Sequence, residues 1–148
     1  MAVKYTYNGT DVFICATTQA ADLDQTGFEA LTWIQINGVG NAGEWSTEDN
    51  ILSYNTVDED VSQKQKGIRN AGDPVIEVAR DAADTGQDTL RIAANSALYY
   101  ALKRTLPDGT NQYTRAIIGG PSRPGGANED FILEQFNVGM VQLVLEDA

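Results

Sequence analysis

Residues 38–43, "GVGNAG", form the sharpest chemical motif in the chain, because they match the pattern GxGxxG directly after a strand-like run. In dinucleotide-binding folds such glycines let backbone amides at a helix N-terminus approach a pyrophosphate. Here the next segment, "EWSTEDNILSYNTV", has no helical period, and Glu44, Glu48 and Asp49 would repel phosphate. The context therefore favours a loop between antiparallel strands, and we predict no cofactor.

Carboxylates are the most abundant groups that could do chemistry. The chain has 21 Asp and Glu against 10 Lys and Arg, which gives a net charge of −11. The acidic clusters at 22–24 ("DLD") and 58–60 ("DED") lack the ligand spacing of a calcium loop, so we predict no metal site. A pair of carboxylates for glycoside hydrolysis remains an alternative, because such pairs come from distant positions in a sequence.

Histidine and cysteine chemistry is almost excluded. The chain has no His, which rules out Ser-His and Cys-His nucleophile pairs and His-liganded zinc. The single cysteine, Cys15, lies in the apolar run "DVFICA" and is typical of a small buried hydrophobe. We therefore predict no catalytic residue. No apolar run is long enough to span a membrane, so we expect no membrane partner.

Positive charge is unevenly distributed along the chain. No Lys or Arg lies between Lys4 and Lys64, whereas ten carboxylates do. The one basic cluster, "KQKGIR" at 64–69, directly follows the acidic residues 58–60. Because gripping a nucleic acid backbone requires clustered and uncompensated cations, we do not expect tight DNA binding.

Apolar residues recur mainly with a period of two, which predicts strands. We expect them at 11–17, 28–36, 50–57, 74–80, 97–106 and 111–118, with a closing strand or pair in 131–146. A Pro-Asp-Gly turn at 107–109 should join the fifth and sixth strands. One short helix is expected after Asp84, which can act as N-cap. The sequence thus predicts a mainly β (α+β) fold, an antiparallel β-sandwich or barrel with one short helix, as a single domain over 1–148.

The segment "TVDEDVSQKQKGIRNAGDP", residues 56–74, fits neither a helical nor a strand period. Such a long polar loop in a compact domain is usually disordered or functional. Acidic residues come first and basic residues second along it: Asp58, Glu59 and Asp60, then Lys64, Lys66 and Arg69.

The order and spacing of these features resemble the major tail tube proteins of long-tailed, non-contractile (siphovirus-type) bacteriophages. The resemblance rests on "ALTWIQINGVGNAGE", the strand "NILSYNTVDED", the polar connection, the short helix in "DTGQDTLRIAA" and the hairpin "YYALKRTLPDGTNQYTRAIIG". It implies that six copies form a ring and that the rings stack into a tube for duplex DNA in the virion tail. It also implies synthesis in the bacterial host cytoplasm, and tape measure and terminator proteins as partners.

Within this resemblance, residues 56–74 are expected to form an arm that pairs head-to-tail with neighbouring subunits through its six charged residues. Carboxylates facing the lumen would repel DNA phosphates over roughly 8 Å at physiological salt. The candidates are Glu29, Glu44, Glu48 and Glu77.

Other functions remain open at this point. A ring-forming tail terminator or head–tail joining protein of similar fold is the nearest alternative, followed by a tube protein of a contractile tail. A soluble carboxylate enzyme and a small-ligand-binding β-barrel are the alternatives from other classes.

Overall fold

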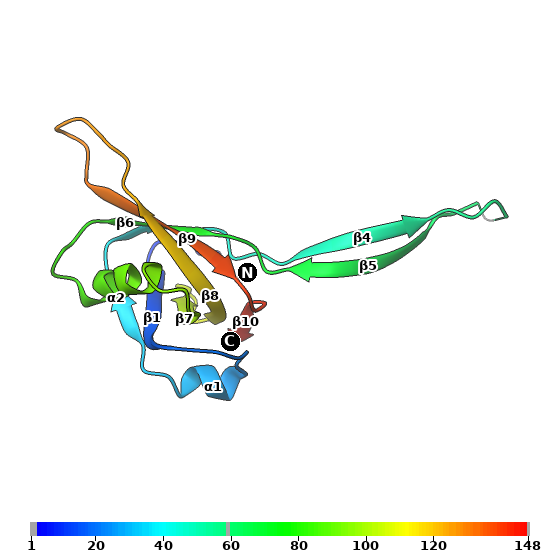
Figure 1. Cartoon of the computed structure of the whole chain (residues 1–148), viewed down its shortest axis with the longest axis horizontal. Helices are drawn as coiled ribbons and strands as arrows, with labels where there is room; N and C mark the ends of the chain where they lie inside the picture. The colour runs from blue at the N-terminus through cyan, green and yellow to red at the C-terminus, as the bar shows by residue number, and fades with distance from the viewer. Residues whose placement is uncertain (1–2, 59, 148) are drawn as a thin grey trace.

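The computed structural model describes residues 3–58 and 60–147, which form a body of antiparallel strands and a long projecting hairpin (Figure 1). The body contains β1 (Asp11–Thr18), α1 (Gln25–Glu29), β2 (Ile34–Ile36), β3 (Val39–Asn41), β6 (Val75–Ala79), α2 (Thr85–Ala94), β7 (Tyr100–Thr105), β8 (Asn111–Ser122), β9 (Leu133–Met140) and β10 (Leu145–Asp147). The hairpin consists of β4 (Glu48–Tyr54) and β5 (Gln63–Asn70). The predicted predominance of antiparallel β-structure is confirmed.

The body strands form one eight-stranded sheet in the order β2-β1-β7-β8-β9-β6-β3, with β10 paired to β8. The long strand β8 connects its two halves: residues 111–116 pair with β7, and residues 116–122 pair with β9. Side chains from β1 and β7 share one buried cluster with side chains from β6 and β9. The two halves of the sheet therefore face each other across the core, as the sandwich or barrel prediction requires.

Helix α2 covers an opening between these halves. The Asp84 side chain accepts a hydrogen bond from the Gln87 backbone N–H at 2.9 Å, which confirms the predicted N-cap. Leu90 and Ala93 on its inner face are fully buried in the core. The helix approaches β2 so closely that a Cβ atom on Gly86 would lie 2.1 Å from the Gln35 carbonyl oxygen.

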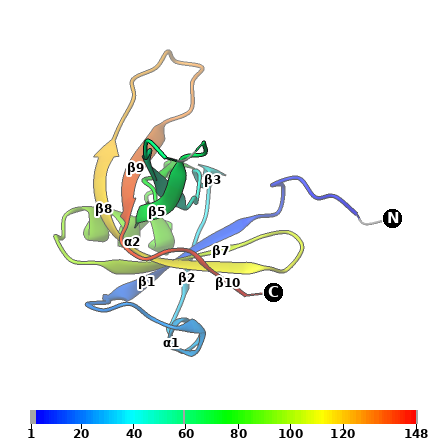
Figure 2. The same cartoon turned by 90° about the vertical axis from the view of Figure 1, so that its right-hand side faces the viewer.

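A second helix, α1, occupies part of the segment predicted as a strand over 28–36, and that prediction is wrong except for Ile34–Ile36. Asp24 caps α1, accepting from the Gly27 N–H at 2.8 Å. Phe28 is fully buried and stacks on Tyr113 with ring centroids 5.1 Å apart. Figure 2 shows α1 and α2 on opposite sides of the β1–β7 layer.

Residues 56–74 are not the structureless loop that the sequence predicts. Strand β5 occupies residues 63–70 and pairs antiparallel with β4 from Glu48↔Asn70 to Tyr54↔Gln63. The two strands pair only with each other. The hairpin points away from the body, with its apex at the far end (Figure 1).

One smaller expectation also changes. The motif at 38–43 contributes β3, which pairs with β6, so only part of it is a loop. The closing pair of strands expected within 131–146 consists of β9, which runs on to Met140, and β10. Within the described part of the chain, neither helix is long and apolar enough to cross a membrane.

Candidate assembly surface

The β4–β5 hairpin exposes apolar side chains on both of its faces. Ile51 and Leu52 are neighbours on β4 and so point to opposite sides of the ladder, yet both are more than half exposed. On β5, Ile68 is 85% exposed. Among the described residues none of these side chains belongs to a core cluster, so these apolar groups of the hairpin face solvent in the isolated subunit.

The end of the hairpin nearest the body carries a small ion-pair cluster. Arg69 Nε lies 2.8 Å from Asp49 Oδ1, and Lys66 Nζ lies 3.5 Å from Asp49 Oδ2. Asp49 and Arg69 are paired across the two strands. Among the described residues Lys64 forms no ion pair. Two of the three predicted arm cations are therefore engaged within the hairpin itself.

Two acidic residues of the predicted arm lie at the hairpin apex. Asp58 and Asp60 fall between β4 and β5, while Glu59 lies outside the described residues. A hydrogen bond from Ser62 Oγ to Asn55 Oδ1 links the two strands just below the apex. The structure thus separates an acidic apex from a shaft that carries Lys64, Lys66 and Arg69.

The four candidate lumen carboxylates do not share one element. Glu29 lies at the end of α1, not in the predicted strand, and accepts from Gln25 at 3.2 Å. Glu44 is exposed between β3 and β4, and Glu48 begins β4. Glu77 alone lies in the main sheet, on the outer face of β6, where it accepts a hydrogen bond from Gln135 at 2.9 Å.

A pocket at the base of the hairpin contains a buried cation that sequence reasoning missed. Arg104 on β7 is 6% exposed. Its Nε and Nη2 donate to Gln112 Oε1 at 2.9 and 2.5 Å, and its Nη1 donates to the Gly43 carbonyl at 3.4 Å. The guanidinium also lies over the Trp45 ring at 5.0 Å and the Tyr7 ring at 5.9 Å.

No carboxylate within the described residues forms an ion pair with Arg104. Burial lowers the pKa of its guanidinium, and the charges of Tyr7 and Glu146 oppose that shift only in part. Glu146 on β10 is two strands away, across Gln112. The sequence gives one weak signal of this arrangement, the polar Arg104 at a core-facing position of β7.

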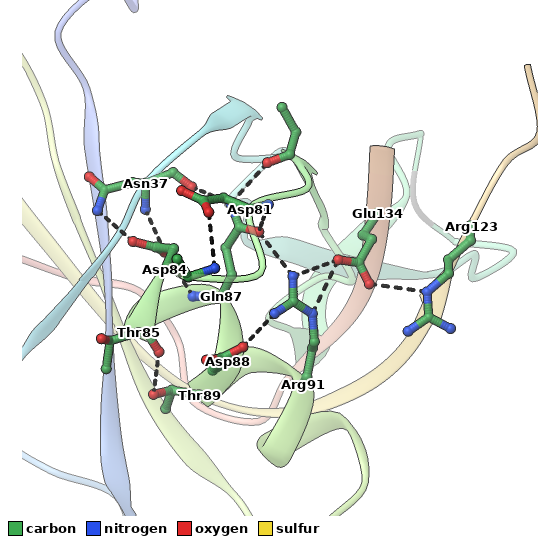
Figure 3. A network of polar contacts seen from close by, with 12 residues as sticks. Asn37, Asp81, Asp84, Thr85, Gln87, Asp88, Thr89, Arg91, Arg123 and Glu134 are labelled. Atoms are coloured by element: carbon green, nitrogen blue, oxygen red, sulfur yellow. Dashed lines mark hydrogen bonds and ion pairs between the residues drawn. The ribbon is translucent and has the colours of Figure 1, made fainter. Parts of the chain in front are cut away.

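The body also contains a buried charged group that does form ion pairs (Figure 3). Glu134 on β9 is fully buried, and Arg91 Nη2 lies 2.7 Å from its Oε1, while Arg123 Nε lies 3.2 Å from its Oε2. The hydrogen bond from Arg91 lowers the pKa of Glu134, against the opposing effect of burial. This carboxylate is therefore held ionised by two cations of its own chain.

The same network fixes the start of α2 (Figure 3). Gln87 is fully buried, and its Nε2 donates to the carbonyls of Asn37 and Ala79 at 2.7 and 2.9 Å. Burial raises the pKa of Asp84, but hydrogen bonds from the Asn37 side chain and the Gln87 and Asn37 backbone lower it by more, so the net shift is downward. Every buried polar group here has a partner, which indicates a structural role.

No group of three or more His, Cys, Asp or Glu side chains among the described residues is arranged to hold a metal ion. The conspicuous features are instead an uncovered hairpin and an unpaired buried cation at its base. Exposed apolar side chains like those of the hairpin are typical of a surface that binds another protein chain.

Residues 10–140 match the family model described as phage tail tube protein. The chain belongs to this family. It is therefore a structural component of a phage tail and not an enzyme. A search of curated proteins finds no match.

Solved structures share the tail tube fold at low sequence identity. A chain of the anti-feeding prophage baseplate, solved by cryo-electron microscopy with six-fold symmetrisation, has a TM-score of 0.71 at 10% identity, covering 100% of this chain and 98% of that one. A chain from the sheath/tube terminator of an extracellular contractile injection system has a TM-score of 0.67 at 14% identity, covering 99% and 100%.

A chain from the anti-feeding prophage tube-terminating cap has a TM-score of 0.59 at 14% identity, covering 100% and 95%. At these identities the likeness shows the fold alone. The assignment to a non-contractile tail stays a prediction, because the family description names no tail type and one of these structures comes from a contractile injection system.

Proposed function

We propose that this tail tube protein, acting as one domain over residues 1–148, forms hexameric rings that stack into a tube through which duplex DNA passes. The observation that carries the proposal is the β4–β5 hairpin with apolar side chains exposed on both faces. In this proposal the protein is made in the host cytoplasm and resides in the virion tail, with tape measure and terminator proteins as further partners.

The hairpin is poorly suited to remain uncovered. An isolated two-stranded hairpin is at best marginally stable in water, because it has too little packing to offset its loss of conformational entropy. Both strands also present a free edge, which is a template for pairing with another chain. Contact with neighbouring subunits would cover the edges and the exposed Ile51, Leu52 and Ile68 together. The six-fold symmetrised assembly of a structural neighbour supports a ring of six.

The net charge of −11 is compatible with DNA passage without binding. Glu77 is the candidate lumen carboxylate that the sheet presents on its outer face, away from the core residues Ile76 and Val78. In a narrow channel such carboxylates would repel phosphates within roughly 8 Å. Glu29, Glu44 and Glu48 lie on other elements and remain predicted candidates.

Negative-stain electron microscopy of the concentrated protein tests the proposal, with tubes as the expected result. A triple variant, Lys64→Glu, Lys66→Glu and Arg69→Glu, should remove the tubes, because these cations line the shaft that meets the neighbour. The circular dichroism spectrum and the free energy of unfolding of the variant should match those of the unaltered protein. Tubes of normal appearance from the triple variant would contradict the role of the shaft cations.

The triple variant also places new carboxylates beside Asp49, which now pairs with Lys66 and Arg69. A matched variant that adds Asp49→Arg restores opposite charges within the hairpin. Assembly should stay blocked in this fourfold variant, because the face toward the neighbour is still reversed. Recovery of tubes would mean that repulsion inside the hairpin, and not a lost contact between subunits, caused the effect.

A second candidate function is a tail terminator that forms rings without extending a tube. The fold likeness to a sheath/tube terminator chain and to a tube-terminating cap chain favours keeping it. The same micrographs separate the two functions: single rings at every concentration support a terminator, and long tubes support the tube.

A further inference from the structure

We propose that the pocket around Arg104 receives an acidic side chain from the hairpin apex of a second copy of this chain. The inference rests on the proposed tube function and names the receptor for its hairpin. It identifies a cation–carboxylate contact between subunits that the isolated subunit leaves half-made.

The first step is the incomplete bonding of Arg104. A guanidinium has five N–H donors, and three donate to Gln112 and to the Gly43 carbonyl. Two donors thus have no acceptor within the described residues. A buried charge without a counter-charge is unfavourable. In a chain with 21 carboxylates, the lack of an ion-pair partner for Arg104 among the described residues favours a partner supplied from outside.

The second step is the lining of the pocket. It combines Arg104 with the aromatic ring of Tyr7 and the apolar side chains of Val12 and Val39. Thr10, which also lines it, has a buried hydroxyl with no hydrogen-bond partner. The pocket therefore offers spare donors between apolar walls, which suits a carboxylate flanked by hydrophobic side chains.

The third step is the occupant. At the hairpin apex Asp58 and Asp60 lie between Val57 and Val61, whose side chains are 108% and 76% exposed. The carboxylates of the apex complement the charge of the Arg104 guanidinium, and the flanking valines complement the apolar lining of the pocket. Strands of seven and eight residues hold the apex on the order of 25 Å from the base of the hairpin. An apex therefore cannot fill the pocket at its own base, whereas the apex of a second copy can.

Such an apex-to-base contact joins two different surfaces of the same chain. Contacts of this heterologous kind repeat from copy to copy and generate rings or open-ended stacks. The pocket rim includes Glu44, which would be a like-charged neighbour of the docked apex. Docking would place Glu44 between subunits and remove it from the candidate lumen residues.

Disulfide trapping tests the contact with Arg104 left intact. The test protein carries Asp58→Cys at the apex and Glu44→Cys at the pocket rim, and the native Cys15 is buried. Mild oxidation of assembled tubes should give a ladder of linked subunits that disappears on reduction. A matched protein carries Asp58→Cys and Glu129→Cys, the latter on the exposed β8–β9 connection. Its subunits should show no disulfide links after the same oxidation.

A second experiment measures the lowest protein concentration at which tubes form, with the tubes detected by pelleting. Arg104→Gln should raise it at least tenfold, whereas Glu44→Gln should lower it, because the first removes the attraction and the second a repulsion. In the Arg104→Gln protein, the further changes Asp58→Asn and Asp60→Asn should raise the concentration needed for assembly only slightly, because the contact is already lost.

The outcomes distinguish the inference from the proposed function. Tubes without a ladder, or an equal ladder from the Glu129→Cys control, would overturn the apex–pocket contact and leave the tube proposal standing. Failure of the unaltered protein to form tubes would overturn the tube proposal itself. If the paired cysteines prevent assembly, the concentration needed for assembly decides instead. Equal values for Arg104→Gln, Glu44→Gln and the unaltered protein would also overturn the contact.

Discussion

The body and the β4–β5 hairpin are both built from antiparallel ladders, yet they treat apolar side chains in opposite ways. On β6 in the body, Ile76 and Val78 are fully buried in the core. On β4 and β5, Ile51, Leu52 and Ile68 are mostly exposed. The core of the body is closed within one subunit, whereas under the proposed function the hairpin is covered only by other chains. On that proposal the body carries folding and the hairpin carries assembly.

Each region also holds one carboxylate between two cations. In the body Glu134 is fully buried between Arg91 and Arg123. In the hairpin the side chain of Asp49 is 23% exposed, between Lys66 and Arg69. The chemistry is the same and the solvent exposure differs, so the two clusters form a matched pair for experiments.

The largest expected effect comes from a pair of isoleucines, one in each region. Ile76→Ala leaves a cavity in the core and should lower the free energy of unfolding by roughly 2–5 kcal/mol. Ile68→Ala removes an exposed side chain and should change it by less than about 0.5 kcal/mol. Urea unfolding followed by the fluorescence of Trp33 and Trp45 measures both, because both tryptophans pack against the body clusters.

Assembly should reverse this ranking. If the hairpin is covered in the tube, Ile68→Ala raises the concentration at which tubes form, although the subunit is as stable as before. The conservative variant Ile76→Val keeps most of the core volume. It serves as the control that shows whether a small loss of subunit stability by itself changes tube formation. Equal tube formation by Ile68→Ala and the unaltered protein would remove the distinction between a folding region and an assembly region.

The same distinction explains which elements could be predicted from the sequence. Strands β6 and β9 alternate because one face of each is buried in the subunit. Strands β1, β7 and β8 also bury a side chain on the opposite face, at Cys15, Ala101 and Tyr113, so their apolar residues report burial as well. Strand β5, "QKQKGIRN", has no buried face and therefore no period. Its pairing with β4 is made by backbone hydrogen bonds, which leave no mark on side-chain type. A polar strand and a polar loop look alike for this reason.

The errors at the candidate sites have separate physical causes. Phe28 continues the apolar alternation of Ile34 and Ile36, but the N-cap Asp24 starts a helical turn that buries Phe28 on the other side of the sheet. The same false continuation predicts a strand at Glu29. Asp58, Lys64 and Arg69 belong to one segment of the sequence, but their separation into apex and shaft depends on the hairpin register. The pocket around Arg104 joins residues that are distant in sequence.

A change at Glu134 should give the intermediate effect. Glu134→Gln keeps the shape of the side chain but turns an N–H group toward one of the two arginines. The loss of a charged hydrogen bond to Arg91 should lower the free energy of unfolding by roughly 1.5–3 kcal/mol at neutral pH. Arg123→Gln, which removes the more exposed partner, should have a smaller effect.

The pH dependence gives the sign of the Glu134 contribution. Its pKa in the folded body is lowered from the usual 4.5, so its stabilising contribution is fully present above that value. The contribution is lost as the pH falls through the lower folded-state pKa. The difference in free energy of unfolding between the unaltered protein and Glu134→Gln should therefore shrink below about pH 4.5. A constant difference down to pH 2 would mean that the charge of Glu134 does not stabilise the body.

Asp49→Asn in the hairpin should give the smallest effect on the isolated subunit. Ion pairs exposed to solvent contribute about 0.2–1 kcal/mol, and Lys66 and Arg69 are both more than half exposed. Global unfolding should not detect the change, because the hairpin lies outside the core. Hydrogen exchange of the β4 and β5 amides should detect it as a rise in rate of up to roughly fivefold, since 1 kcal/mol corresponds to about that factor. The variant Lys64→Gln removes a shaft charge that has no ion pair among the described residues and should leave these rates unchanged. If Asp49→Asn lowers the stability of the body as much as Glu134→Gln does, the two regions are one cooperative unit, and the hairpin is held by the body before any neighbour arrives.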